Sequence, residues 1–222
     1  MEKKAVMSSS VAGLVLLCLA AVVHATESPE YEVVHSEPDF EVRLYGESTW
    51  MSSSVDGITF REATYLGFHR LFQYIQGANL NNSRIPMTFP VLTSVVPGAE
   101  PFHSSPYTVF FYLPAKFQAS PPVPLTELHL RSDAWSSRCV AVRKFSGVAR
   151  EGSITKEMEQ LALSLSRSPW ANSTSSKSKF AYSIAQYDSP LRLIGRTNEV
   201  WVDVDASGSE GCASGSGGMA TY

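Results

Sequence analysis

The chain has few of the residues from which catalytic and metal sites are usually built. Its 222 residues include three cysteines and five histidines, with neither a Cys-x-x-Cys pair nor a His-Glu-x-x-His motif. A zinc site with closely spaced ligands is therefore not predicted. The Gly-x-Ser-x-Gly motif and a glycine-rich phosphate loop are also absent, which argues against the common hydrolase and nucleotide-binding classes. We expect a protein that is not an enzyme.

Positive charge and long apolar runs are also scarce. The sequence has 18 Lys and Arg against 21 Asp and Glu, a net charge of −3, whereas nucleic-acid binding needs a clustered positive surface. The apolar run 11–23 follows Lys3 and Lys4 and precedes Val23-His24-Ala25, which is the pattern of a secretory signal peptide cleaved after Ala25. The run is too short to span a bilayer comfortably. We therefore expect residues 1–25 to be removed, leaving a soluble extracellular or vacuolar protein with no nucleic-acid partner and no stable membrane insertion.

Cysteine is scarcer still after this processing, because Cys18 lies in the predicted signal peptide. A bridge between the remaining Cys139 and Cys212 is possible in an oxidising compartment. Cys212, however, lies in the segment 206–222, whose Gly and Ser content predicts a disordered tail with nothing to bury. We therefore favour a buried free thiol for Cys139.

Two N-glycosylation sequons fit secretory entry. They are Asn81-Asn82-Ser83 and Asn172-Ser173-Thr174, and both lie in polar stretches that are expected to form loops. Because a secreted chain carries glycan at exposed sequons of this kind, Asn81 and Asn172 are predicted glycosylation sites.

The chain does contain a repeated pattern of strand, helix, strand and strand. Apolar residues alternate in the predicted strands and recur every three to four residues in the predicted helices. The first half has strand 40–45, helix 59–75 and strands 87–96 and 107–113; the second has a short strand 127–131, strand 140–145, helix 153–167 and strands 180–187 and 199–204. Residues 26–205 are thus predicted to form one α+β domain. We expect a curved, mostly antiparallel β-barrel of two pseudo-repeated halves with two flanking α-helices.

The two predicted helices differ in their outer faces. Helix 153–167 collects its apolar residues on one face, as a helix that covers a sheet does. Helix 59–75 instead carries apolar side chains around most of its circumference. We interpret one of its surfaces as packed on the sheet and the other as the wall of a groove for an apolar ligand.

Four separated segments carry a family resemblance: 67–79, 85–91, 108–124 and 185–202. They include Gly-Phe-His-Arg-Leu-Phe-Gln-Tyr-Ile-Gln-Gly-Ala-Asn at 67–79 and Gly-Arg-Thr-Asn-Glu-Val-Trp-Val at 195–202. In this order they resemble the SOUL family of haem-binding proteins over residues 31–203. The resemblance implies the same curved fold and, as ligand, haem or another tetrapyrrole, with the protein as a carrier, buffer or scavenger. Three alternatives stay open: another amphipathic small molecule as the ligand, an enzyme that acts on tetrapyrroles, and a protein-interaction module that uses the apolar helix.

The resemblance also implies which residues line the groove. They are Tyr65, Phe68, His69, Leu71, Phe72 and Gln73 on the helix and Leu191, Arg192 and Leu193 on the opposing loop. Animal members of the family have basic residues where this chain has Tyr65 and Gln73. Pairing of this helix with haem propionates is therefore expected to depend on neutral hydrogen bonds, which are weaker than charge-assisted ones. Arg192 matches a basic position of the family.

His69 allows two interpretations. Its imidazole could bind haem iron, or it could lie at the helix edge with a water or backbone partner. We favour the second, because a lone histidine on a helix is common and the family has no uniform protein-supplied iron ligand. The same residue would be the acid or base of the enzyme alternative.

Overall fold

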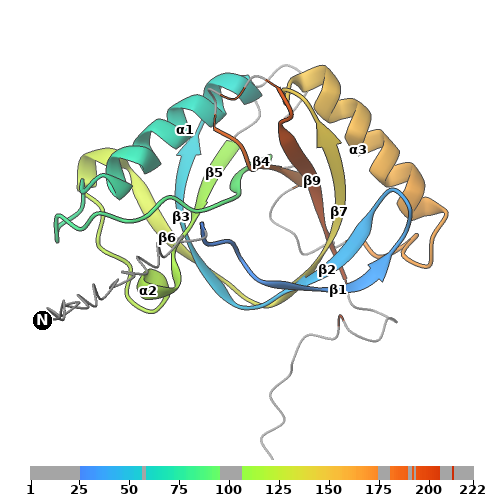
Figure 1. Ribbon diagram of the computed structural model, residues 1–222, viewed down its shortest axis with the longest axis horizontal. Helices are drawn as coiled ribbons and strands as arrows, with labels where there is room; N and C mark the ends of the chain where they lie inside the picture. The colour runs from blue at the N-terminus through green and yellow to red at the C-terminus, as the bar shows by residue number, and fades with distance from the viewer. Residues whose placement is uncertain are drawn as a thin grey trace, which may run out of the picture.

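A single curled sheet of antiparallel strands organises the fold. The computed structural model describes residues 26–56, 59–95, 107–174, 181–189, 192, 194–205 and 212, and the predicted signal peptide lies outside them. The strands of the described chain are β1 (Tyr31–Ser36), β2 (Glu41–Tyr45), β3 (Ser48–Val55), β4 (Val91–Val95), β5 (Tyr107–Tyr112), β6 (Leu130–Trp135), β7 (Arg138–Ser146), β8 (Tyr182–Gln186) and β9 (Thr197–Val204). Their order in the sheet is β1-β2-β7-β9-β8-β4-β5-β3-β6. The sheet curls into a half-barrel (Figure 1), as predicted.

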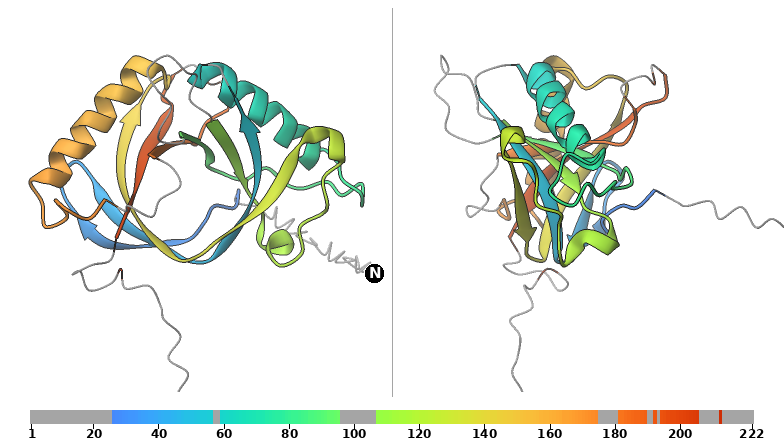
Figure 2. Two further views of the ribbon diagram at one scale, coloured as in Figure 1. Left: turned by 180° about the vertical axis from the view of Figure 1, so that it is seen from behind. Right: turned by 90° about the vertical axis from the view of Figure 1, so that its left-hand side faces the viewer.

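Two long helices lie on the outer face of this half-barrel. The helical elements are α1 (Phe60–Ile75), α2 (Ala115–Gln118), the 3-10 turn η1 (Thr126–Leu128) and α3 (Glu151–Ser166). Figure 2 shows α1 and α3 on the outside of the curved sheet, one over each half. The two flanking helices that the sequence predicts are therefore confirmed.

The topology confirms two pseudo-repeated halves but corrects the first strand of the first half. The expected strand 40–45 is β2, which pairs with β7 of the other half, and the first half begins instead with β3. One half is β3-α1-β4-β5 and the other is β7-α3-β8-β9, and in each the first strand pairs with the last. The pairing of β4 with β8 joins the halves. Each half also borrows a strand, because β2 pairs with β7 and β6 pairs with β3. This exchange makes one continuous sheet out of two units that could not each bury both faces alone.

Side chains alternate between the two faces of the sheet along each strand. They form two apolar clusters on the outer face and one on the inner face. On the outer face, α1 packs over a cluster that includes Met51, Leu71, Tyr74, Val109 and Phe111. α3 packs over a second outer cluster that includes Val42, Ala141, Ile154, Leu161 and Val200. The inner face is largely aromatic and includes Tyr45, Trp50, Phe110, Trp135 and Trp201.

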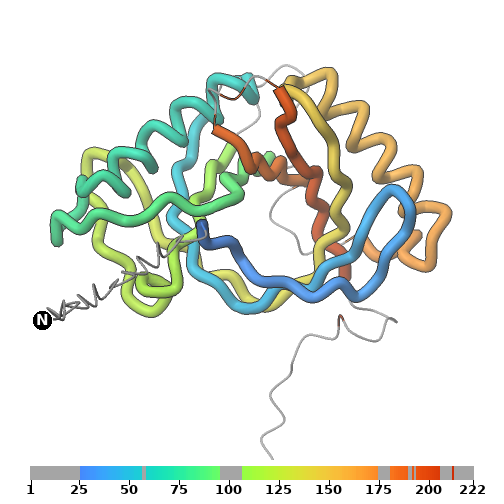
Figure 3. Tube along the Cα trace, viewed as in Figure 1, coloured from blue at the N-terminus to red at the C-terminus, as the bar shows by residue number. Residues whose placement is uncertain are grey.

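The start of the described chain closes the open side of the half-barrel. The backbone carbonyl of Glu27 accepts a hydrogen bond from Phe89 N at 3.0 Å, and its carboxylate accepts one from Ala115 N at 2.7 Å. From there the chain runs to β1, which pairs with β2 at the other end of the sheet (Figure 3). Buried Pro29 lies against the inner aromatic cluster at a cavity of about 10 Å³, which holds at most one water.

The sequence missed two strands and displaced several boundaries. The strand expected at 87–96 begins only at Val91, as β4. Neither β1 nor β3 was predicted, and η1 occupies the first residues of the strand expected at 127–131, so that β6 begins at Leu130. α3 begins at Glu151 rather than at the predicted cap Ser153. Ser153 still stabilises the helix start, because its hydroxyl accepts a hydrogen bond from Arg150 N at 3.0 Å.

The preferred interpretation of the cysteines is wrong. Cys139 and Cys212 form a disulfide, with their Cα atoms 5.8 Å apart. Both are buried in the cluster beneath α3, and Cys212 is 5% exposed. The tail therefore does bury a side chain at Cys212, although the rest of the segment 206–222 lies outside the described residues.

Candidate functional site

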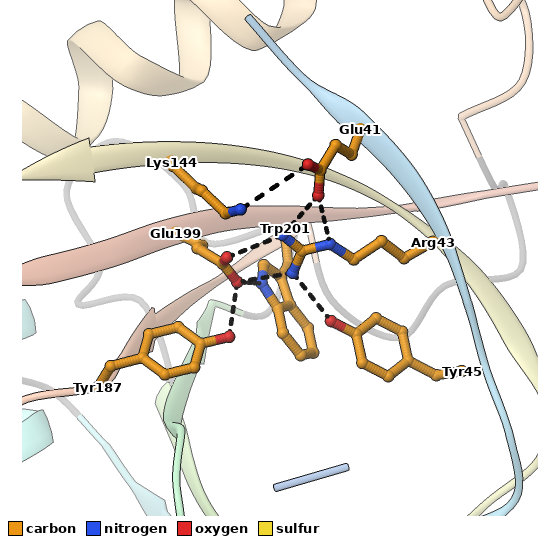
Figure 4. Close-up of polar contacts among 7 residues, drawn as sticks. All are labelled: Glu41, Arg43, Tyr45, Lys144, Tyr187, Glu199 and Trp201. Carbon is orange, nitrogen blue, oxygen red and sulfur yellow. Dashed lines mark hydrogen bonds and ion pairs between the residues drawn. The ribbon is translucent and has the colours of Figure 1, made fainter. Parts of the chain in front are cut away.

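The inner face of the sheet holds a buried ion pair between Arg43 on β2 and Glu199 on β9. The two guanidinium nitrogens Nη1 and Nη2 donate to the Glu199 carboxylate at 3.1 and 3.0 Å (Figure 4). Tyr187 Oη and Trp201 Nε1 donate to the same carboxylate at 2.7 and 2.8 Å. Arg43 also donates to Glu41 at 2.8 Å from Nε. Four hydrogen bonds and 3% exposure hold the Glu199 carboxylate inside the protein rather than presenting it to a ligand.

The pKa values in this network fit a structural role. Burial is the largest single influence on Arg43 and disfavours its charged form, but the charge of Glu199 and the hydrogen bonds to Glu199 and Tyr45 together outweigh burial and raise the pKa of Arg43 above its usual value. Burial raises the pKa of Tyr187, and the charge of Glu199 raises it further. Burial likewise raises the pKa of Tyr45. Arg43 thus stays charged and both phenols stay neutral near pH 7, which suits a tie between β2 and β9 rather than a proton-transfer site.

α1 is held firmly against the outer face of the sheet. Its N-cap Thr59 accepts a hydrogen bond from Glu62 N at 3.3 Å. At Gly67 the helix approaches β5 so closely that an added Cβ would lie 2.4 Å from Val109 Cγ2. Farther along, Tyr74 Oη donates to Pro122 O at 2.8 Å. These contacts fix which residues of α1 face away from the sheet.

The outward face of α1 is a stripe of aromatic side chains. Tyr65 is 68% exposed, Phe72 is 43% exposed, and Phe68 is half-buried between them and the core. The Tyr65 and His69 rings stack with centroids 6.3 Å apart, and the Phe68 and Phe72 centroids are 5.9 Å apart. Gln73 extends the stripe, with its Nε2 3.0 Å from His69 Nδ1. Positions 65, 68, 69, 72 and 73 share one helical face, and we call them the aromatic face of α1.

The structure separates the remaining predicted residues from this face. Leu71 is 1% exposed and packs in the core under α1, so its assignment to the groove-facing side is wrong. Leu191 and Leu193 lie outside the described residues. The ligand contacts predicted for the other helix residues stay predictions.

Arg192 is exposed but already paired within its own loop. Its Nη1 lies 2.6 Å from Asp188 Oδ1, and its Nε donates to Ile194 O at 3.1 Å. The Thr197 backbone N–H and the Arg192 guanidinium lower the pKa of Asp188, so the pair persists at neutral pH. A ligand carboxylate would have to compete with Asp188 for Arg192.

Arg61 is a candidate that the sequence interpretation missed. It is exposed one turn before Tyr65 on the same helical face. Its guanidinium makes no hydrogen bond or ion pair with any residue in the described ranges. The sequence signal was available, because Arg61, Tyr65 and His69 follow one another at intervals of four residues.

Other chemistry is sparse in the part of the chain that the structure describes. It contains no group of three or more His, Cys, Asp or Glu side chains that could hold a metal ion. None of its helices combines the length and apolar character needed to cross a membrane. Asn81 and Asn172 are both exposed, so each amide is accessible, and their glycosylation stays a prediction.

The chain is similar to haem-binding proteins along most of its length. The model of the SOUL heme-binding protein family matches residues 26–203. The human protein named Heme-binding protein 2 is 36% identical over 186 residues, which cover 82% of this chain and 88% of the human protein. Heme-binding protein 1 of Xenopus laevis is 31% identical over 162 residues, covering 73% of this chain and 82% of the frog protein.

A solved structure of a hydrolase from Listeria innocua shares the fold. It matches with a TM-score of 0.51 at 6% identity, over 76% of this chain and 93% of the bacterial chain. Identity this low supports a common arrangement of strands and helices and nothing about a shared activity.

Proposed function

Given that the chain belongs to the SOUL heme-binding protein family, we propose that it binds haem or a related tetrapyrrole on the aromatic face of α1. The protein would act without chemical conversion, as a carrier, buffer or scavenger. The observation that carries this proposal is the row formed by exposed Tyr65 and Phe72 and half-buried Phe68 on a helix fixed to the sheet. Such a row remains exposed at a cost of about 25 cal/mol per Å² of apolar surface left in water. A flat apolar ligand would recover that free energy.

The firm attachment of α1 supports binding to a preformed surface. The close approach at Gly67 and the Tyr74 hydrogen bond hold the helix before any ligand arrives. Little conformational freedom would then be lost on binding, and loss of freedom is a main cost of association. A tetrapyrrole is also amphipathic, with two faces of apolar ring and an edge that carries carboxylates.

The carboxylate edge has a limited set of partners here. Arg61 has a guanidinium without a partner among the described residues, and Tyr65 and Gln73 offer neutral donors. Arg192 is occupied by Asp188. Neutral donors give weaker hydrogen bonds than charged ones, so we expect moderate affinity. The donor set fits a haem carboxylate without a dedicated charged pocket.

We further propose that the protein works in the secretory pathway, outside the cell or in a vacuole. The segment 1–25 has the composition of a signal peptide. The disulfide between Cys139 and Cys212 suits an oxidising compartment. Both Asn81 and Asn172 are exposed, as glycosylation requires.

The site is tested by placing a charge on the aromatic face. Phe72→Asp should weaken binding of protoporphyrin IX by at least about tenfold, because it repels the anionic ligand and removes apolar contact. Leu163→Asp is the matched control, since Leu163 lies on α3 with the same 43% exposure as Phe72. Tryptophan fluorescence quenching during titration measures both. Equal affinities for the two variants would show that the ligand does not bind on α1.

A second candidate ligand is a different amphipathic small molecule on the same face. The observation that favours it is the neutral character of Tyr65 and Gln73, which leaves these two positions of the helix without fixed positive charge. Competition between hemin and a neutral, flat fluorescent dye separates the two. Displacement of the dye at stoichiometric hemin supports the tetrapyrrole; a dye that hemin cannot displace favours the alternative.

A further inference from the structure

We propose that His69 supplies an axial ligand to haem iron through its Nε2 atom and that Gln73 positions the imidazole. This inference depends on the proposed function, because it concerns the iron of a haem bound on the aromatic face of α1. It replaces the interpretation of His69 as a helix-edge histidine with a water or backbone partner. The structure gives His69 a side-chain partner instead.

His69 lies at the centre of the exposed surface of α1. The residues of α1 that pack on the sheet are Phe60, Ala63, Gly67, Leu71, Tyr74 and Ile75. At 100° per residue, position 69 lies almost opposite the middle of that buried set. Tyr65 stacks on one side of the imidazole, and Phe72 follows one turn along the helix. The imidazole thus lies within the face on which a tetrapyrrole would bind.

The hydrogen bond to Gln73 leaves one ring nitrogen of His69 free. Nδ1 lies 3.0 Å from Gln73 Nε2, and Nε2 of His69 makes no hydrogen bond with any residue in the described ranges. The donor orientation of the Gln73 amide keeps the proton on Nε2, since an amide NH₂ only donates. Turning the amide by 180° presents Oε1 to Nδ1, which then carries the proton and frees the Nε2 lone pair for iron. Metal-bound histidines nearly always donate their other ring N–H in this way.

Other described ligand candidates are less suited to this position. His35 is half-buried on β1, and its Nε2 lies 3.0 Å from Glu37 Oε1. Its ring contacts Phe40 and Trp170 in the cluster beneath α3, not α1. His129 follows η1 and lies off the helix. Tyr65 has an exposed phenol on the same face and is the one alternative iron ligand there. The experiment must therefore distinguish His69 from Tyr65.

The experiment compares hemin with iron-free protoporphyrin IX in the mature protein. In His69→Ala, hemin affinity should fall by roughly 10–100-fold, the hemin absorption spectrum should lose its protein-induced shift, and protoporphyrin affinity should change less than about twofold. Tyr65→Phe keeps the ring and removes the hydroxyl, and should retain the hemin spectrum. Gln73→Leu should lower hemin affinity roughly tenfold more than protoporphyrin affinity, because both porphyrins lose the same neutral carboxylate donor and hemin alone loses the support of His69. Gln160→Leu, at an exposed position of α3, is the matched control and should change neither the hemin nor the protoporphyrin affinity.

Each outcome decides the proposal. A hemin spectrum and affinity unchanged in His69→Ala overturn it, as does loss of the shift in Tyr65→Phe alone. Equal loss of hemin and protoporphyrin binding in His69→Ala also overturns it, because the imidazole would then act by packing. Failure of the unsubstituted protein to bind either porphyrin would instead refute the proposed function, and this inference with it.

Discussion

Breaking the disulfide between Cys139 and Cys212 should destabilise the whole domain. The bridge joins residues 73 apart, and constraining a loop of that length in the unfolded chain is worth about 4 kcal/mol in the chain-entropy model. Native disulfides deliver roughly 2–5 kcal/mol in practice. For a domain of this size each kcal/mol changes the melting temperature by about 2–4 °C. Cys212→Ser should therefore lower the melting temperature by roughly 10 °C.

Differential scanning calorimetry of the mature protein, made in an oxidising host, measures this change. Deleting residues 206–222 should lower the melting temperature as much as Cys212→Ser, whereas deleting 213–222 keeps Cys212 and should have no effect. Dithiothreitol should destabilise the unsubstituted protein and leave Cys212→Ser unchanged. Cys212→Ser could have the same melting temperature as the unsubstituted protein, or the reductant could lower both melting temperatures equally. Either result would show that the disulfide does not anchor the tail.

Two further predictions concern the charge network and the processing of the chain. Arg43→Met should lower the free energy of unfolding in urea by about 3–5 kcal/mol, because it leaves the buried Glu199 carboxylate without its ion partner; a loss below about 1 kcal/mol would show that the pair is dispensable. Intact-mass measurement of protein from a eukaryotic secretory host should find Thr26 as the first residue and glycan on Asn81 or Asn172. A product that retains residues 1–25 and keeps its mass after deglycosylation would contradict both.

Hydrophobic patterning predicted the elements that bury one continuous apolar face. It missed β3, which buries polar side chains as well. α1 and α3 each bury a continuous face, so their spacing is clear in the sequence. β3 reads Ser-Thr-Trp-Met-Ser-Ser-Ser-Val, yet Ser52 and Ser53 are 1% and 0% exposed. Ser52 is satisfied by Asp133 and Ser53 by Arg70. These partners lie outside the strand, so the local sequence does not reveal them. A run of polar residues alone predicts a loop.

The sequence predicts the parts of the candidate site whose positions follow from helical spacing. It does not predict the parts whose positions depend on contacts between distant segments. The interval of three and four residues places Tyr65, Phe68 and Phe72 together. Leu71 was misplaced because a helix apolar on most sides does not reveal which leucine meets the sheet. The Arg43–Glu199 pair joins residues 156 apart, and the Cys212 bridge contradicts the composition around it. No local signal carries either contact.

The two halves of the fold provide an internal comparison for the functional argument. α1 and α3 occupy equivalent places in β3-α1-β4-β5 and β7-α3-β8-β9, and each meets the same requirement to cover the sheet. The exposed side of α3 is mainly polar, with Lys156, Glu159 and Gln160 in the open, which is what solubility favours. The exposed side of α1 is aromatic. Both helices already bury one face against the sheet, so the fold does not require the aromatic face of α1. Exposing these aromatic side chains to water costs free energy, and this cost arises in the half that contains α1. The proposed tetrapyrrole, bound on this face, would account for that difference.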